Sequence, residues 1–149
     1  MALYDDLGGT VGLEKVHRIL YGKLFAHPWL KGFFEGKKRH HLESQQTDFM
    51  TDVFGGPKIY GGRLPKSAHM HMFIPEEVFT LRHDMLAASL NEARVPSDQA
   101  KQWLKYDMSI KRALVKQSPA DCEGRYNNEK PLVVAKPSMG IGIGRAVAS

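Results

Sequence analysis

Apolar residues recur every three or four positions through four long stretches of this chain, and glycine or proline interrupts the stretches. That spacing places side chains on one face of an α-helix, whereas a half-buried strand would alternate polar and apolar residues. No stretch alternates long enough to predict a strand. We therefore expect an all-α fold with four or five main helices. The predicted helices are residues 11–27, with Thr10 as N-cap, 38–54, 75–95 and 100–116, with a short helix at 66–73.

The size and composition are those of one soluble globular domain, with 149 residues of which 42% are hydrophobic and 25% charged. Cys122 is the single cysteine, so the chain has no internal disulfide and no thiolate cluster for zinc or iron–sulfur. The first residues lack the pattern of an export signal, and no apolar run approaches the ~20 residues that span a bilayer. We expect a monomeric, cytoplasmic protein that is not inserted in a membrane.

The net charge of +5 would suit an acidic partner such as nucleic acid. The lysines and arginines are nevertheless spread along the chain, and their one cluster, residues 37–41, has no interleaved aromatic side chain for base stacking. We expect no nucleic-acid binding.

Residues 118–149 show no helical period and contain repeated proline and glycine breaks. Their glycine run, residues 140–144, lacks the preceding strand and following helix of a phosphate-binding loop. We therefore divide the chain into a domain at residues 1–117 and a tail at residues 118–149. The role of the tail stays open, because both disorder and packing against the domain fit its sequence.

One face of the predicted helix 38–54 carries an amide among apolar side chains. Leu42, Gln46, Phe49 and Val53 lie within about 60° of one another at ~100° per residue. A buried amide without a partner costs roughly 1–3 kcal/mol. Gln46 must therefore bond a protein neighbour or face something polar held inside the fold, such as a cofactor.

His69 is a candidate to hold such a cofactor. It lies on the predicted short helix with Phe73 one turn onward, so that an imidazole and an aromatic ring can share one inward face. A neutral imidazole is a common ligand of haem iron. A solvated surface histidine is the ordinary alternative. The run from His69 to Met72 offers a third interpretation, because imidazole and thioether together suit Cu(I), although in a helix these side chains diverge.

Several motifs in order make the chain resemble a group I truncated haemoglobin over residues 3–116. The resemblance rests on their combined spacing. The motifs are Leu3-Tyr4-Asp5-Asp6-Leu7-Gly8-Gly9, Phe33-Phe34, Gln46-Thr47-Asp48-Phe49, Phe54-Gly55-Gly56-Pro57, Tyr60-Gly61-Gly62-Arg63 and Ala68-His69. It implies a two-over-two helical globin sandwich around one non-covalent b-type haem, followed by a C-terminal extension.

The resemblance also assigns site residues. His69 would be the proximal iron ligand, and Tyr21, Gln46 and a further amide, Gln45, would lie on the distal side and donate hydrogen bonds to dioxygen. Tyr21 borders the apolar stripe of its own predicted helix, which agrees with an inward hydroxyl. The remaining pocket residues would be Phe34, packed on the porphyrin, Leu42 at the entry, Phe49 beside a gas tunnel, and Phe73 on the proximal wall.

The implied function is reversible binding of O₂, NO or CO. Tight retention of O₂ would also favour NO dioxygenation to nitrate with an external reductase, and a haem-based gas sensor or interaction module would use the tail as its output surface. The chain departs from some relatives, because Gln45 occupies the position of a histidine that can bind the iron as a sixth ligand. We therefore expect five-coordinate or weakly six-coordinate ferrous iron, with His41 the one nearby rival. Covalent haem attachment through the last helix is not expected, because no histidine follows His83.

Overall fold

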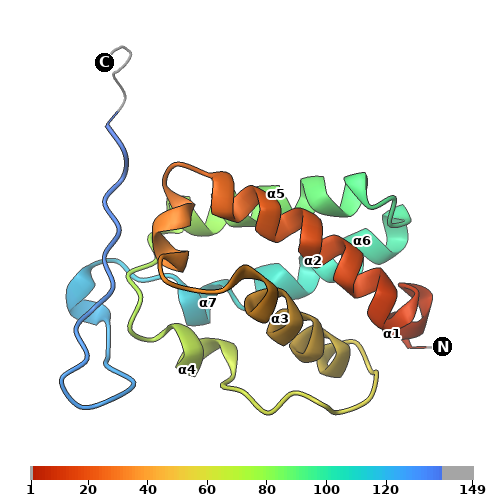
Figure 1. The fold of residues 1–149 in the computed structure, drawn as a ribbon, viewed down its shortest axis with the longest axis horizontal. Helices are drawn as coiled ribbons and strands as arrows, with labels where there is room; N and C mark the ends of the chain where they lie inside the picture. Colours follow the sequence, from red (N-terminus) through yellow and green to blue (C-terminus); the bar gives the residue numbers. More distant parts are fainter. Residues whose placement is uncertain (1, 139–149) are drawn as a thin grey trace.

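The computed structural model describes residues 2–138, and these residues form helices joined by short turns and loops (Figure 1). No strand is present among them, and Met72 and Leu132 form an isolated parallel bridge. The prediction of an all-α fold is confirmed. The elements are α1 (Leu3–Asp6), α2 (Gly9–Ala26), η1 (Leu30–Phe34), α3 (Arg39–Val53), α4 (Pro65–His69), α5 (Glu76–Glu92), α6 (Ser97–Ser109), α7 (Lys111–Leu114) and η2 (Pro119–Asp121).

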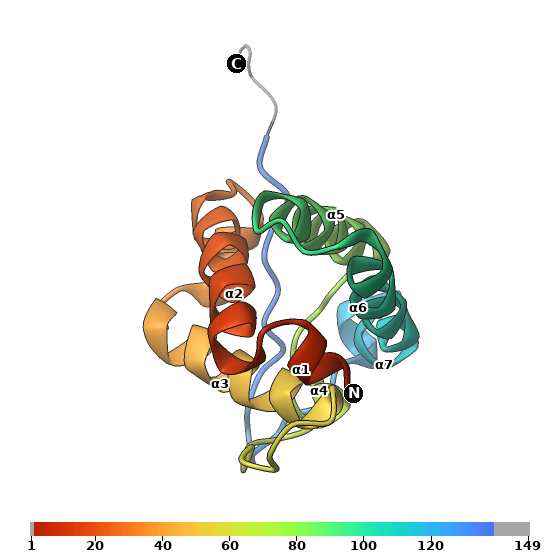
Figure 2. The same ribbon diagram turned by 90° about the vertical axis from the view of Figure 1, so that its right-hand side faces the viewer.

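Two helix pairs face each other, with α2 and α3 on one side and α5 and α6 on the other (Figure 2). Helix α2 packs most extensively against α3 and next against α5. Its apolar stripe supplies Leu13, Val16, Leu20 and Leu24, which are all buried in the core. The amphipathic period that predicted α2 therefore also brings the two pairs together, and the space between the pairs is where a site can form.

Three details of the helices differ from the prediction. Helix α2 begins at Gly9 after Gly8, whose φ of 90° lies in the left-handed region, so Thr10 is not the N-cap. The Thr10 hydroxyl instead lies 2.8 Å from the Tyr4 hydroxyl, which ties α2 to α1. The predicted last helix is two helices, because Ile110 separates α6 from α7. The short helix α4 ends at His69 instead of reaching Phe73.

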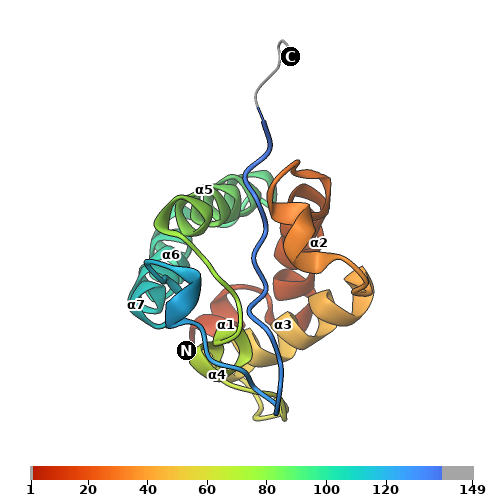
Figure 3. The same cartoon turned by 90° about the vertical axis from the view of Figure 1, so that its left-hand side faces the viewer.

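The tail packs against the domain through contacts that extend to Lys136. In Figure 3 it runs across one end of the molecule, between the α2–α3 pair and helices α5 to α7. The Trp29 indole Nε1–H donates to the Val134 carbonyl at 3.1 Å, and Leu132 and Val134 pack against the buried core. The glycine run 140–144 lies outside the described residues. Within residues 2–138, no helix is long and apolar enough to cross a membrane.

Candidate functional site

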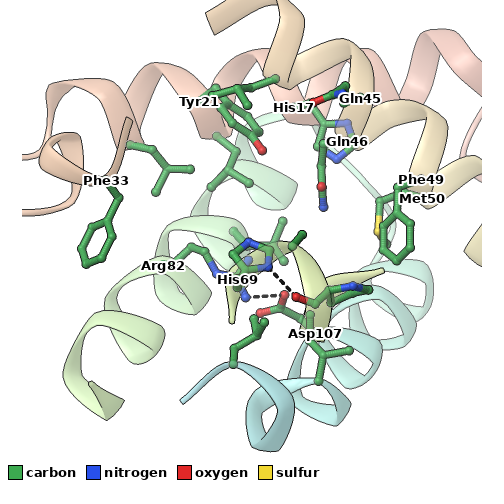
Figure 4. A pocket seen from close by; sticks show the side chains of 18 of the residues that line it. His17, Tyr21, Phe33, Gln45, Gln46, Phe49, Met50, His69, Arg82 and Asp107 are labelled. Atoms are coloured by element: carbon green, nitrogen blue, oxygen red, sulfur yellow. Dashed lines mark hydrogen bonds and ion pairs between the residues drawn. The ribbon is translucent and has the colours of Figure 1, made fainter. Parts of the chain in front are cut away.

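A cavity of about 390 Å³ lies between the two helix pairs. Helices α2, α3, α4, α5 and α6 all contribute to its wall, and its size falls within the usual range of small-molecule sites. Figure 4 shows its side chains, with Tyr21, Gln45 and Gln46 on one side and His69 on the other. Apolar lining comes from Leu20, Leu24, Phe33, Phe34, Leu42, Phe49, Met50, Met72, Leu86 and Leu114.

His69 is oriented by a hydrogen bond within its own short helix. Its Nδ1 lies 2.7 Å from the Pro65 carbonyl oxygen. Because a carbonyl only accepts, Nδ1 carries the proton and Nε2 keeps its lone pair. Burial is the main cause that lowers the pKa of His69, and the charges of Arg82 and Lys116 lower it further. The imidazole is therefore neutral at physiological pH, which is the form that binds a metal ion.

Tyr21 and Gln46 reach the cavity from α2 and α3 and lie across it from His69 (Figure 4). Burial raises the pKa of Tyr21 to about 12, so its hydroxyl stays protonated and can donate. The Tyr21 ring meets the Phe34 ring edge to face at 6.0 Å between centroids. Neither the Tyr21 hydroxyl nor the Gln46 amide bonds another side chain among residues 2–138. Both groups can therefore serve a ligand in the cavity.

The face of α3 that carries Gln46 borders the cavity, as its amide suggested. Leu42, Gln45 and Phe49 line the cavity with it, and Phe34 joins them from η1. The side chains of α3 that are fully buried in the protein are instead Thr47, Met50 and Thr51. The apolar stripe predicted from periodicity thus mainly faces the cavity, which explains how a polar amide can be part of it.

Phe73 is a correction to the predicted site. It is not among the residues that line the cavity, and Met72 lines the wall beside His69 instead. The physical reason is that α4 ends at His69, so the helical geometry that would carry Phe73 to the same face does not continue. His71 is buried outside the cavity lining. Because His69 and His71 do not share the cavity, the histidine–methionine run does not converge on one point.

Two further polar groups in the cavity wall were missed from the sequence. His17 is buried one turn before Tyr21, and its Nδ1 lies 2.8 Å from the Thr47 hydroxyl. Burial lowers the pKa of His17 to about 3. Its four-residue spacing from Tyr21 was a signal that could have revealed it.

The second group is an ion pair between α5 and α6. Arg82 donates to Asp107 Oδ1 at 2.6 Å, and His83 Nδ1 donates to Oδ2 of the same carboxylate at 2.7 Å. Arg82 and Asp107 both line the cavity, and Asp107 is buried. Because 25 residues separate the two partners, no local pattern in the sequence could have predicted this contact.

The donor set of the cavity fits a haem group. It combines one imidazole nitrogen with a free lone pair, aromatic and aliphatic walls for a porphyrin, and two hydrogen-bond donors on the opposite side. Cationic side chains also border it, and two of them, Lys37 and Arg63, are exposed and so lie at its opening to solvent. Positive charge at the opening suits the two carboxylates that haem carries.

Comparison with known proteins also indicates a haem globin. The profile of the bacterial-like globin family matches residues 2–115. The chain is 34% identical to the group 1 truncated hemoglobin of Mycolicibacterium paratuberculosis, over 69% of this chain and 76% of that protein. It is also 34% identical to the group 1 truncated hemoglobin of Tetrahymena pyriformis, over 62% of this chain and 77% of that protein.

Solved structures agree. The Fe(III) form of the Tetrahymena pyriformis truncated hemoglobin superposes with a TM-score of 0.70 at 28% identity, covering 78% of this chain and all of the other. The 2/2 hemoglobin of Synechococcus sp. PCC 7002, with covalently attached heme, superposes with a TM-score of 0.70 at 26% identity, covering 76% of this chain and 95% of the other. The chain therefore belongs to the bacterial-like globin family, and it is a gas-binding haem globin with the two-over-two helical fold of truncated haemoglobins.

Proposed function

We propose that this globin binds O₂, NO and CO reversibly at the iron of a non-covalent b-type haem held by His69. The observation that carries the proposal is the arrangement across the cavity. The free Nε2 lone pair of His69 is on one side, and the Tyr21 hydroxyl and the Gln46 amide are on the other. Ferrous haem supplies the affinity for diatomic gases, and the protein side chains tune it.

Each side chain has a distinct role in this proposal. His69, held through Nδ1 by the Pro65 carbonyl, presents Nε2 to the iron. Tyr21 and Gln46 donate hydrogen bonds to a polar diatomic ligand, and Gln45 is a further amide at the same wall. Phe34 packs on the porphyrin, Phe49 borders a tunnel for the gas and Leu42 lines the entry, and these apolar side chains exclude water. Exclusion of water strengthens each donor, because hydrogen bonds are electrostatically stronger at low local dielectric.

The test is the absorption spectrum of the purified protein. The reduced protein should show a Soret band that shifts when O₂ or CO is added, and apoprotein should take up one equivalent of hemin. A colourless protein that takes up no hemin would overturn the proposal. A five-coordinate ferrous spectrum is expected. Besides His69, the described cavity lining contains two histidines that could act as a sixth ligand. His17 is buried and held by Thr47, and His41 is exposed to solvent.

NO dioxygenation is the second candidate function. The two donors opposite His69 favour it, because strong hydrogen bonding retains O₂ until NO arrives. One NO and one O₂ give one nitrate, and the electron comes from the ferrous iron, so an external reductase must supply it again. Mixing the oxygenated protein with one equivalent of NO should give one equivalent of nitrate and ferric protein. Release of O₂ without nitrate would exclude this activity.

A further inference from the structure

The C-terminal segment at residues 117–136 begins just after the stretch that the globin family profile matches, yet it is bonded to the peptide that follows His69. The Glu123 N–H donates to the Met70 carbonyl at 2.8 Å. Leu132 bonds in both directions, because its N–H donates to the His71 carbonyl at 2.8 Å and its carbonyl accepts from the Phe73 N–H at 2.9 Å. The segment therefore holds residues 70–73, which have left the helix that carries His69.

The far end of the segment is anchored on η1 and α5. A Cβ built on Gly32 would lie 2.5 Å from a methyl group of Val134, so glycine is needed for this close approach. Lys136 lies 2.9 Å from the Glu77 carboxylate and covers the Trp29 ring. The segment thus crosses one end of the molecule (Figure 3), and it is held near residues 70–73 at one point and by η1 and α5 at another.

Arg125 is the residue of this segment that lines the cavity within residues 2–138. Glu129 holds its backbone N–H, its Nε and its Nη2, with the shortest contacts at 2.7 Å. The guanidinium also covers the Tyr126 ring. Its Nη1 bonds no other described residue, so the guanidinium of this lining residue keeps a donor that is free for a ligand.

The charge of the cavity wall indicates what this donor would bind. Lys37, Arg63, Arg82 and Arg125 are cationic, whereas Asp107 is the one carboxylate among the described lining residues and is paired with Arg82. A carboxylate is the natural partner of a guanidinium. We propose that residues 117–136 form a wall of the haem pocket and that Arg125 binds a haem propionate. The proposal rests on haem binding at His69.

The first experiment compares two forms of the cofactor in the full-length protein. Haem loss to an acceptor apoprotein is measured for Arg125→Gln loaded either with haem or with haem dimethyl ester, whose propionates are uncharged. We expect haem to leave the variant about 1.5-fold to fivefold faster than it leaves the parent protein, as for a solvent-accessible ion pair. The diester should leave both proteins at the same rate.

Arg112→Gln is the matched control, because Arg112 is exposed, lies outside the cavity and loses the same charge. It should retain both cofactors like the parent, and Arg125→Lys should recover part of the retention of haem. Equal acceleration of haem and diester would show that Arg125 only holds the segment, and no acceleration would show that it has no role. Either result overturns propionate binding. If the parent protein binds neither cofactor, the proposed function itself fails.

The second experiment tests the wall. Gly32→Ala pushes against Val134, whose branched side chain cannot rotate freely out of the way, whereas nothing lies within 4 Å of a Cβ at Gly61. Gly32→Ala should speed hydrogen exchange at the Leu132 and Phe73 amides and speed haem loss, and Gly61→Ala should change neither. Faster exchange without faster haem loss would overturn the claim that the segment is part of the pocket, as would unchanged exchange.

Discussion

At the scale of single residues, the hydrogen-bonding state of each polar atom decides what the cavity can do. The Pro65 carbonyl accepts a hydrogen bond from the Nδ1–H of His69 and so leaves Nε2 as the atom that can bind iron. Tyr21 keeps its proton because burial raises its pKa to about 12. The periodicity of α3 was enough to predict that Gln46 and Leu42 share a face, because that relation is local. The tautomer of the His69 ring, with the proton on Nδ1, could not be predicted, since it depends on where the Pro65 carbonyl points.

Tyr21→Phe removes one donor from the cavity and leaves the ring in place. Loss of a hydrogen bond to a charged or strongly polarised ligand costs roughly 1.5–3 kcal/mol, so O₂ should dissociate at least about tenfold faster. Gln46→Leu should act in the same direction. Tyr4→Phe is the control, because the Tyr4 hydroxyl bonds Thr10 and does not line the cavity. Stopped-flow O₂ release that is unchanged in Tyr21→Phe would show that the hydroxyl does not contact the ligand.

His17 predicts a loss of stability in acid. Its pKa is lowered from 6.5 to about 3 by burial, so between these pH values the unfolded chain takes up a proton that the folded protein does not. Stability therefore falls as the pH drops below 6.5, on the order of 1.4 kcal/mol per pH unit from this group. Urea unfolding at pH 7 and pH 5 should show a smaller acid effect in His17→Gln, which can still bond Thr47. Parallel losses in the two proteins would contradict the prediction.

At the scale of elements, α3 and the α5–α6 pair show how the cavity is kept open. Helix α3 packs in the core with Thr47, Met50 and Thr51 and keeps its Gln46 face for a ligand. Across the cavity, the Asp107 carboxylate on α6 accepts hydrogen bonds from both Arg82 and His83 on α5. The helices themselves were predictable from apolar spacing and Gly or Pro breaks. The end of α4 at His69 could not be predicted in this way, because residues 70–73 form backbone hydrogen bonds with the distant tail.

Asp107→Asn should lower the free energy of unfolding by about 2 kcal/mol, because a partly buried guanidinium and an imidazole lose their shared charged partner. Urea unfolding measures the difference. Asp84→Asn is the matched control, since Asp84 is exposed on α5 and forms no ion pair with a described residue. Equal stability of Asp107→Asn and the parent protein would show that the ion pair contributes nothing net to the fold.

At the scale of the whole molecule, the tail changes the description of the domain. The sequence indicated a globin of residues 1–117 followed by a tail of open role, because residues 118–149 have no helical period. The structure packs residues 118–136 against both sides of one end of the globin, through contacts such as Trp29 with Val134, which lie 105 residues apart. Backbone hydrogen bonds of an extended segment leave no periodic signature, so sequence patterns could not predict them.

The most direct measurement of the central claim is the absorption spectrum of reduced His69→Gly and His71→Gly proteins with CO, before and after addition of imidazole. His69→Gly should lose haem or its histidine-ligated spectrum, and added imidazole should restore that spectrum by replacing the missing ligand. His71→Gly should keep the parent spectrum, because His71 lies outside the cavity lining. A parent spectrum in His69→Gly, with loss of haem in His71→Gly, would contradict the assignment of the iron ligand.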